Sequence, residues 1–148
     1  MTGVVPLSEA ERTFAEYHRV AHLATADASG VPHVIPVCYA LVRGCLYFVV
    51  DEKPKRTRHR LKRLRNLAEN PRAALVIDEY DDDWSRLAYL LVQGTAALVI
   101  DRKEYAAVLA ALRRRYPPYR GMALRYDRNP MVRMEPSAWH FWRAAGAQ

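Results

Sequence analysis

Cysteine is scarce in this sequence, and long hydrophobic runs are absent. The 148 residues include two cysteines, Cys38 and Cys45, whose spacing matches no metal motif, so both are interpreted as packing residues. No apolar run approaches the roughly 20 residues that a membrane-spanning helix needs. Residues 1–6 lack the charged start and apolar stretch of a signal peptide. We therefore expect a cytoplasmic protein with no membrane insertion.

Motifs that place catalytic or metal-binding side chains are also missing. The five histidines show no ligand spacing, and the run Asp81–Asp83 lacks the alternation and closing glutamate of a calcium loop. There is no GxSxG, no HExxH and no GxxxxGK[ST] phosphate loop. We therefore expect no metal site and no catalytic side chain. If the protein is an enzyme, a bound cofactor would supply the chemistry.

Positive charge is plentiful and concentrated in one segment. The net charge is +7, and residues 53–65 read KPKRTRHRLKRLR. This segment can be a solvated helix face, a nucleic-acid-binding surface or a phosphate site. Nucleic acid is the least favoured partner, because no helix-turn-helix pattern or series of stacking aromatics accompanies the basic residues. A basic loop between a buried strand and a helix is a natural place to hold a cofactor phosphate.

Periodicity and turn signals predict a mainly β (α+β) chain in a single domain, residues 1–148. Capping boxes at Ser8/Glu11 and Asp101/Glu104 predict helix starts. The expected helices cover residues 8–19, 58–69 and 101–115, and the expected strands cover residues 20–27, 32–42, 45–51, 73–78, 88–100 and 131–135. Six antiparallel strands with few flanking helices favour a closed or nearly closed barrel.

Proline, glycine and tryptophan mark special positions on these strands. Pro32 and Pro36 cannot donate to a ladder, so their strand lies at an edge or is bulged, or it leaves backbone groups free for a flat ligand. Gly94 predicts a bulge in its long strand. The tryptophans could stack on such a ligand, but they are more often core or dimer-interface residues (Trp84, Trp139 and Trp142).

Three segments together resemble a known family. They are LATADASGVPHVIPVCYALVRGCLYFVVD (23–51), LRNLAENPRAALVID (64–78) and DDDWSRLAYLLVQGTA (81–96). Their order, with the basic loop between the first two, resembles the pyridoxamine 5′-phosphate oxidase-related FMN-binding split barrels, and most of all their actinobacterial F420-dependent branch. The resemblance implies a six-stranded split β-barrel and a homodimer whose cofactor lies in a cleft between subunits.

The resemblance also implies where the cofactor binds. One strand would line the flavin or deazaflavin ring through its backbone (Ile35, Pro36, Val37 and Cys38). The end of another would lie beside the ring (Val49, Val50 and Asp51). A basic pair before Asn70-Pro71 would bind the phosphate; it is Lys62 and Arg63 when counted back from this motif, and Lys55 and Arg56 when counted forward from Asp51. We favour the loop pair, Lys55 and Arg56, because it is nearer the helix N-terminus.

This sequence departs from the true oxidases at positions that bind their substrate. Those enzymes have arginine at the position of Ile35 and an Arg-Gln pair near Ala88-Tyr89, which argues against a role in vitamin B6 synthesis. We expect an F420-dependent oxidoreductase that transfers a hydride to a small unsaturated or quinone-like molecule. The alternatives are an FMN-binding oxidoreductase, or a flavin or haem carrier or sensor without turnover.

Overall fold

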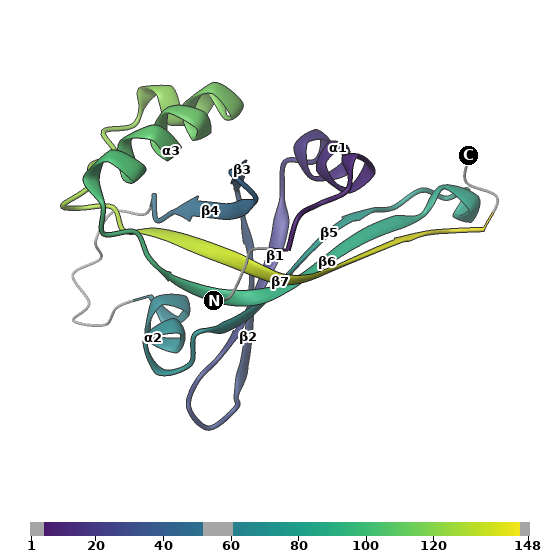
Figure 1. Cartoon of the computed structure of the whole chain (residues 1–148), viewed down its shortest axis with the longest axis horizontal. Helices are drawn as coiled ribbons and strands as arrows, with labels where there is room; N and C mark the ends of the chain where they lie inside the picture. The colour runs from purple at the N-terminus through teal and green to yellow at the C-terminus, as the bar shows by residue number, and fades with distance from the viewer. Residues whose placement is uncertain (1–4, 52–60, 146–148) are drawn as a thin grey trace.

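The chain folds mainly as one curled antiparallel β-sheet with three α-helices (Figure 1). The computed structural model describes residues 5–51 and 61–145. In chain order the elements are α1 (Glu9–Tyr17), β1 (Ala21–Ala26), β2 (Pro32–Val37), β3 (Ala40–Val42), β4 (Cys45–Val49), α2 (Lys62–Glu69), β5 (Arg72–Glu79), the short 3₁₀ helix η1 (Trp84–Arg86), β6 (Ala88–Leu98), α3 (Arg102–Arg115), the 3₁₀ helix η2 (Pro117–Gly121) and β7 (Met131–Arg143). Within these described ranges, no helix combines the length and apolar character required to cross a membrane.

The sheet has seven strands in the order β2-β1-β5-β6-β7-β4-β3, so the expected number of six was wrong. The predicted strand 32–42 breaks into β2 and β3, which lie at opposite edges of the sheet. The break falls at Cys38 and Tyr39, where the backbone N–H of Tyr39 donates to the hydroxyl of Tyr116 instead of to a neighbouring strand. Pro32 and Pro36 therefore lie on an edge strand, as one interpretation of the prolines predicted.

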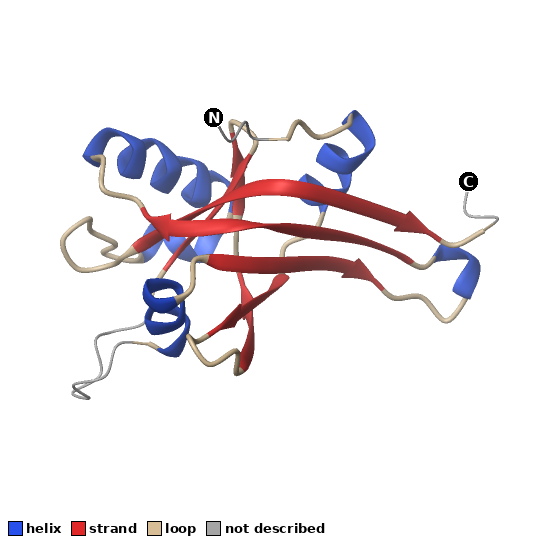
Figure 2. Ribbon diagram, turned by 60° about the horizontal axis from the view of Figure 1, so that its bottom comes forward, coloured by secondary structure: helices blue, strands red, loops and turns tan. Residues whose placement is uncertain are grey.

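Strands β5, β6 and β7 run side by side and extend well beyond the rest of the sheet as an arm that ends at η1 (Figure 2). Strand β7 continues to Arg143, so the prediction that it ends at Glu135 was wrong. Pro136 does not end the strand because it pairs with Gly94 at an irregularity of the β6–β7 ladder between Gln93 and Gly94. This irregularity confirms the predicted bulge.

Two hydrophobic cores hold the helices on the sheet. The larger core lies on one face of the strands and receives Phe14 from α1, with Leu64 and Leu67 of α2 packed against it. The smaller core joins β3 and β4 to α3, and it includes Tyr105 and Leu112. Burying these apolar side chains stabilises the packing of the helices on the sheet.

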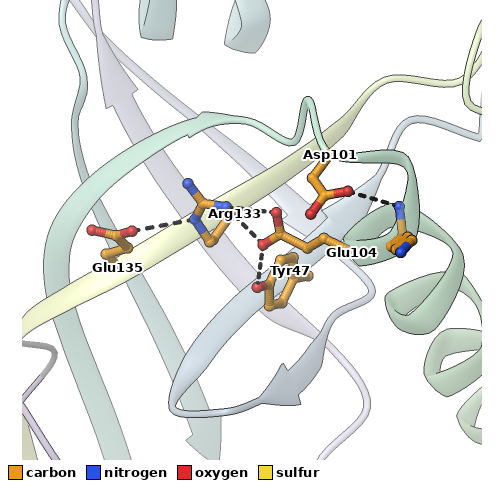
Figure 3. A network of polar contacts seen from close by, with 6 residues as sticks. Tyr47, Asp101, Glu104, Arg133 and Glu135 are labelled. Atoms are coloured by element: carbon orange, nitrogen blue, oxygen red, sulfur yellow. Dashed lines mark hydrogen bonds and ion pairs between the residues drawn. The ribbon is translucent and has the colours of Figure 1, made fainter.

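The two predicted capping boxes have different outcomes. Ser8 and Glu11 form a complete box, with each side chain accepting the other's backbone N–H at 3.1 and 2.8 Å. At α3 the Asp101 side chain accepts the N–H of Lys103, but Glu104 turns to the sheet instead of returning to the cap. The second capping box was therefore wrong, because an arginine on β7 and a tyrosine on β4 offer the glutamate stronger partners (Figure 3).

Candidate functional site

A cavity of about 360 Å³ lies where the ends of β2 and β4 meet η2 and the first turn of α2. This volume is within the range of small-molecule pockets in proteins. Its wall is mostly apolar, with a few polar groups at fixed places. The lining residues are Val20, Ile35, Pro36, Val37, Cys38, Phe48, Val49, Asp51, Arg63 and Tyr119.

Buried tyrosines fix the wall that β2 contributes. The hydroxyl of Tyr116 accepts the N–H of Tyr39 at 3.0 Å and lies 2.9 Å from the Tyr39 carbonyl oxygen. The hydroxyl of Tyr39 donates to the carbonyl of Ala15 at 2.6 Å, and the guanidinium of Arg115 lies over the Tyr39 ring. The chain just after Cys38 is therefore held against both α1 and α3.

A second anchor fixes the wall that β4 contributes. The backbone N–H of Val50 donates to the carbonyl of Pro130 at 2.8 Å, and its carbonyl accepts from the Asn129 side chain at 3.0 Å. Asp51 follows Val50 directly. Asp51 lines the cavity, whereas Val50 is buried. The backbone just before Asp51 is thus braced.

Three polar groups cluster in the cavity wall. The Tyr119 hydroxyl lies beside the Asp51 carboxylate and the Cys38 thiol. Burial raises the pKa of Tyr119 well above its ordinary value, and both neighbours raise it further. Burial likewise raises the pKa of the Cys38 thiol. Tyrosine and cysteine are therefore neutral at physiological pH and can serve as hydrogen-bond donors, which makes this cluster suited to holding a polar ring edge.

The two helical residues of the predicted basic pairs have different surroundings. Arg63 lines the cavity, whereas the ammonium of Lys62 lies 3.6 Å from the Asp27 carboxylate outside it. The helix they begin has Leu61 at its N-cap, and no side-chain hydrogen bond caps its first turn among the described residues. An arginine beside the N-terminus of a helix is a suitable site for an anion. Lys55 and Arg56 lie outside the described residues.

The structure brings most of the predicted ring-contacting residues to one cavity. Ile35, Pro36, Val37 and Cys38 line it, as do Val49 and Asp51, whereas Val50 is buried and does not. The sequence interpretation missed Val20, Phe48 and Tyr119. Tyr119 was expected in a loop, and only the Pro117-Pro118 stop marked its position. The binding roles of all these residues stay predictions.

The tryptophans lie away from this cavity. Trp139 packs against the larger core and donates to the carbonyl of Val5 at 2.9 Å. Trp84 and Trp142 are exposed on the arm, with 68% and 40% of their surface accessible. Among the described residues, no tryptophan lines the cavity, so stacking on a ligand there would fall to other side chains.

The face of the sheet opposite the larger core presents a continuous surface that reaches the cavity. Strand pairing places His22, Val76, Leu91 and His140 in one row across β1, β5, β6 and β7. Tyr89 and Trp142 follow in the next row, with their rings stacked at 5.6 Å. Pro36, which pairs with His22, belongs to the same face and also lines the cavity. We call this surface the outer face.

Comparison with known proteins agrees with the fold. The family model described as pyridoxamine 5′-phosphate oxidase matches residues 7–143. The chain belongs to this family. A 5a,11a-dehydrotetracycline/5a,11a-dehydrooxytetracycline reductase of Streptomyces rimosus is 30% identical to this chain over 95 residues. The match covers 62% of the chain and 63% of the reductase, so it spans less than two thirds of that relative's length.

Solved structures of other proteins share the architecture. A haem-binding protein from Mycobacterium smegmatis matches with a TM-score of 0.76 and 25% identity, over 97% of this chain and 57% of that one. An FAD-binding protein from Mesorhizobium loti matches with a TM-score of 0.66 and 19% identity, over 91% and 92% of the two chains. The second likeness concerns the fold alone. Members of this oxidase-like fold thus include proteins named for flavin and for haem.

Proposed function

We propose that this protein is an F420-dependent oxidoreductase that transfers a hydride to a small unsaturated or quinone-like molecule. The observation that carries the proposal is the cavity, which combines apolar walls with Arg63 and a polar cluster in one space. The family supports oxidoreductase chemistry, and the matched relative is a reductase of a dehydro compound. FMN is the alternative cofactor, since its ring and phosphate suit the same groups.

The residues present fit a flat ring that carries a phosphate. Ile35, Pro36 and Phe48 offer apolar surface for a ring. Pro36 has no backbone N–H to donate to the strand ladder. Arg63 and the first turn of α2 offer donors for an anionic group. When bound, the deazaflavin or flavin supplies the hydride, so the protein itself needs no acid–base triad.

The chain's own residues would bind, orient and shield. The braced backbones after Cys38 and at Val50 hold these two walls in place, which lowers the cost of ordering them on binding. The apolar lining excludes water from the reacting face. The cavity borders the outer face at Pro36, which belongs to both.

A second copy of this chain would pack on the outer face, next to the cavity. The outer face exposes apolar and aromatic side chains, with Val34 62% and Trp142 40% accessible, and its central Leu91 is half-buried. Surfaces of this kind in soluble proteins mark interfaces. Because Pro36 belongs to both the outer face and the cavity, a homodimer formed through this face would complete the site.

A parallel titration with F420 and FMN, followed by fluorescence, tests the proposed function. Tight F420 binding with weak FMN binding supports it and directs a screen of unsaturated substrates. The reverse result would make the protein an FMN-binding oxidoreductase. A bound cofactor, flavin or haem, that turns over no substrate would instead support the carrier or sensor alternative, which the haem-binding structural relative favours. Binding of no cofactor would overturn the proposal.

A further inference from the structure

Asp51 is the acidic residue among those that line the cavity. It stands at the end of β4, with its backbone braced by Pro130 and Asn129 one residue earlier. Its side chain is open to solvent when the cavity is unfilled, because the residue as a whole is exposed. A ring that filled the cavity would displace this water, and the carboxylate would then act on the ring through a medium of lower dielectric constant.

Tyr119, on η2, lies against this carboxylate. The Tyr119 hydroxyl lies beside it, and burial of that hydroxyl keeps it protonated and able to donate. Tyr119 is itself held by its own backbone, since its N–H donates to Tyr116 at 3.0 Å and its carbonyl accepts from Arg113 at 3.2 Å. A hydrogen bond from a fixed hydroxyl holds a carboxylate in one orientation.

We propose that Asp51 lowers the reduction potential of the cofactor that this cavity binds, and that Tyr119 positions Asp51 for this role. The inference rests on the proposed function, because it requires a flavin or deazaflavin in the cavity. Reduction delivers a hydride equivalent to the ring and with it negative charge. A fixed carboxylate nearby opposes this gain, so the reduced ring becomes a stronger hydride donor.

Arg63 lines the same cavity and has the opposite charge. Its effect on the ring has the opposite sign, so the absolute potential reflects both residues. The contribution of Asp51 is therefore read from a difference between variants. Asp51→Asn removes the charge and keeps the shape of the side chain, while Asp51→Glu keeps the charge on a longer side chain.

The test measures the potential of the bound cofactor anaerobically against a reference dye, using F420 or FMN, whichever binds in the titration above. Asp51→Asn should favour the reduced form by about tenfold, which corresponds to roughly 30 mV for a two-electron couple. Asp51→Glu should leave the reduction potential close to that of the unaltered protein. Tyr119→Phe should raise the reduction potential less than Asp51→Asn does, because it frees the carboxylate to move but keeps its charge. Asp82→Asn, on the exposed loop at the tip of the arm, is the matched control.

The outcomes separate this inference from the proposed function. If neither cofactor binds, the proposed function fails first. If a cofactor binds and Asp51→Asn has the same potential as Asp82→Asn, the role of Asp51 is overturned while the binding site stands. Loss of cofactor binding by Asp51→Asn would also overturn it, because the carboxylate would then serve to hold the ring.

Discussion

The guanidinium of Arg133 on β7 lies 2.6 and 2.8 Å from the two carboxylate oxygens of Glu104 on α3. The hydroxyl of Tyr47 donates to the same carboxylate at 2.7 Å, and Glu135 lies 3.2 Å from Arg133 on the other side (Figure 3). The Arg133 and Glu104 side chains are only 28% and 21% exposed, so their hydrogen bonds are stronger than those of a surface ion pair. The network joins the N-terminal turn of α3 to strands β7 and β4.

Replacing Glu104 with glutamine should lower the free energy of unfolding by about 1–2 kcal/mol at neutral pH. Burial alone would raise the pKa of Glu104, but the contacts with Arg133 and Tyr47 outweigh it and hold the pKa below its ordinary value of 4.5. Because the folded-state pKa is the lower one, this contribution is present above about pH 4.5 and is lost as the pH falls through the folded-state pKa.

Urea denaturation of the Glu104→Gln variant between pH 7 and pH 3 checks both statements. The difference from the unaltered protein should shrink on the acidic side. Glu16→Gln, on the exposed surface of α1, is the control and should change stability by no more than about 0.5 kcal/mol. A difference for Glu104→Gln that does not depend on pH would remove the ion pair as its cause.

Gly94→Ala should destabilise the fold by about 1–3 kcal/mol. A Cβ at this position would meet the backbone of Glu135 and Pro136 on the neighbouring strand, and backbone cannot move aside as a flexible side chain does. The register of β6 and β7 changes at this point, so the arm beyond it depends on this close approach. Thermal unfolding measured by circular dichroism gives the effect directly.

Gly121→Ala is the matched control for this substitution. A Cβ on Gly121 would meet nothing within 4 Å, so the melting temperature should stay nearly unchanged. Equal loss of stability in the two variants would mean that glycine flexibility in general, and not the contact with β7, determines the result.

Local signals in the sequence predicted the elements whose stability is local. Ser8 and Glu11 satisfy each other within one turn, and Gly94 marks a bulge through its own missing side chain. The fate of Glu104 could not be predicted in this way, since Arg133 and Tyr47 reach it only after the sheet has formed. The end of β7 was predicted wrongly for the same reason. Pro136 alone indicates the end of a strand, but β7 continues because Pro136 pairs with Gly94 of β6.

The candidate site divides along the same line. The strand residues from Ile35 to Cys38 and those at the end of β4 were reached through resemblance to a family. The Pro117-Pro118 stop before Tyr119 predicts a turn but not its neighbours, because tertiary packing around Tyr116 brings this turn to Cys38. Arg63 lines the cavity only because of how α2 packs on the sheet, and the charge and spacing of the sequence do not predict this packing.

Leu91→Lys should convert a dimer into a monomer if a second copy packs on the outer face. Leu91 pairs with Val76 and His140 in the middle of that face, so an ammonium there would be buried without a partner. We expect the dimer to weaken by about tenfold or more. Sedimentation velocity across a range of protein concentrations measures the change.

Ile100→Lys tests whether any added charge has this effect. Ile100 is 81% exposed and lies beyond the end of β6, so the variant should keep the oligomeric state of the unaltered protein. A monomeric unaltered protein would contradict the homodimer, and dissociation of both variants would place the interface elsewhere.

Arg63→Gln should weaken cofactor binding by about tenfold or more, because a charge-assisted hydrogen bond contributes about 1.5–3 kcal/mol. Lys62→Gln is the matched control: it is adjacent and has the same charge, but its ammonium lies by Asp27 and outside the cavity. A fluorescence titration of both variants at two salt concentrations separates a specific contact from general attraction between a basic surface and an anion, since only the general attraction is strongly screened.

Equal weakening by the two substitutions would mean that the charge of α2 acts as a whole. No weakening by either would leave Lys55 and Arg56 as the predicted phosphate ligands, and Lys55→Ala with Arg56→Ala would then be the variant to titrate.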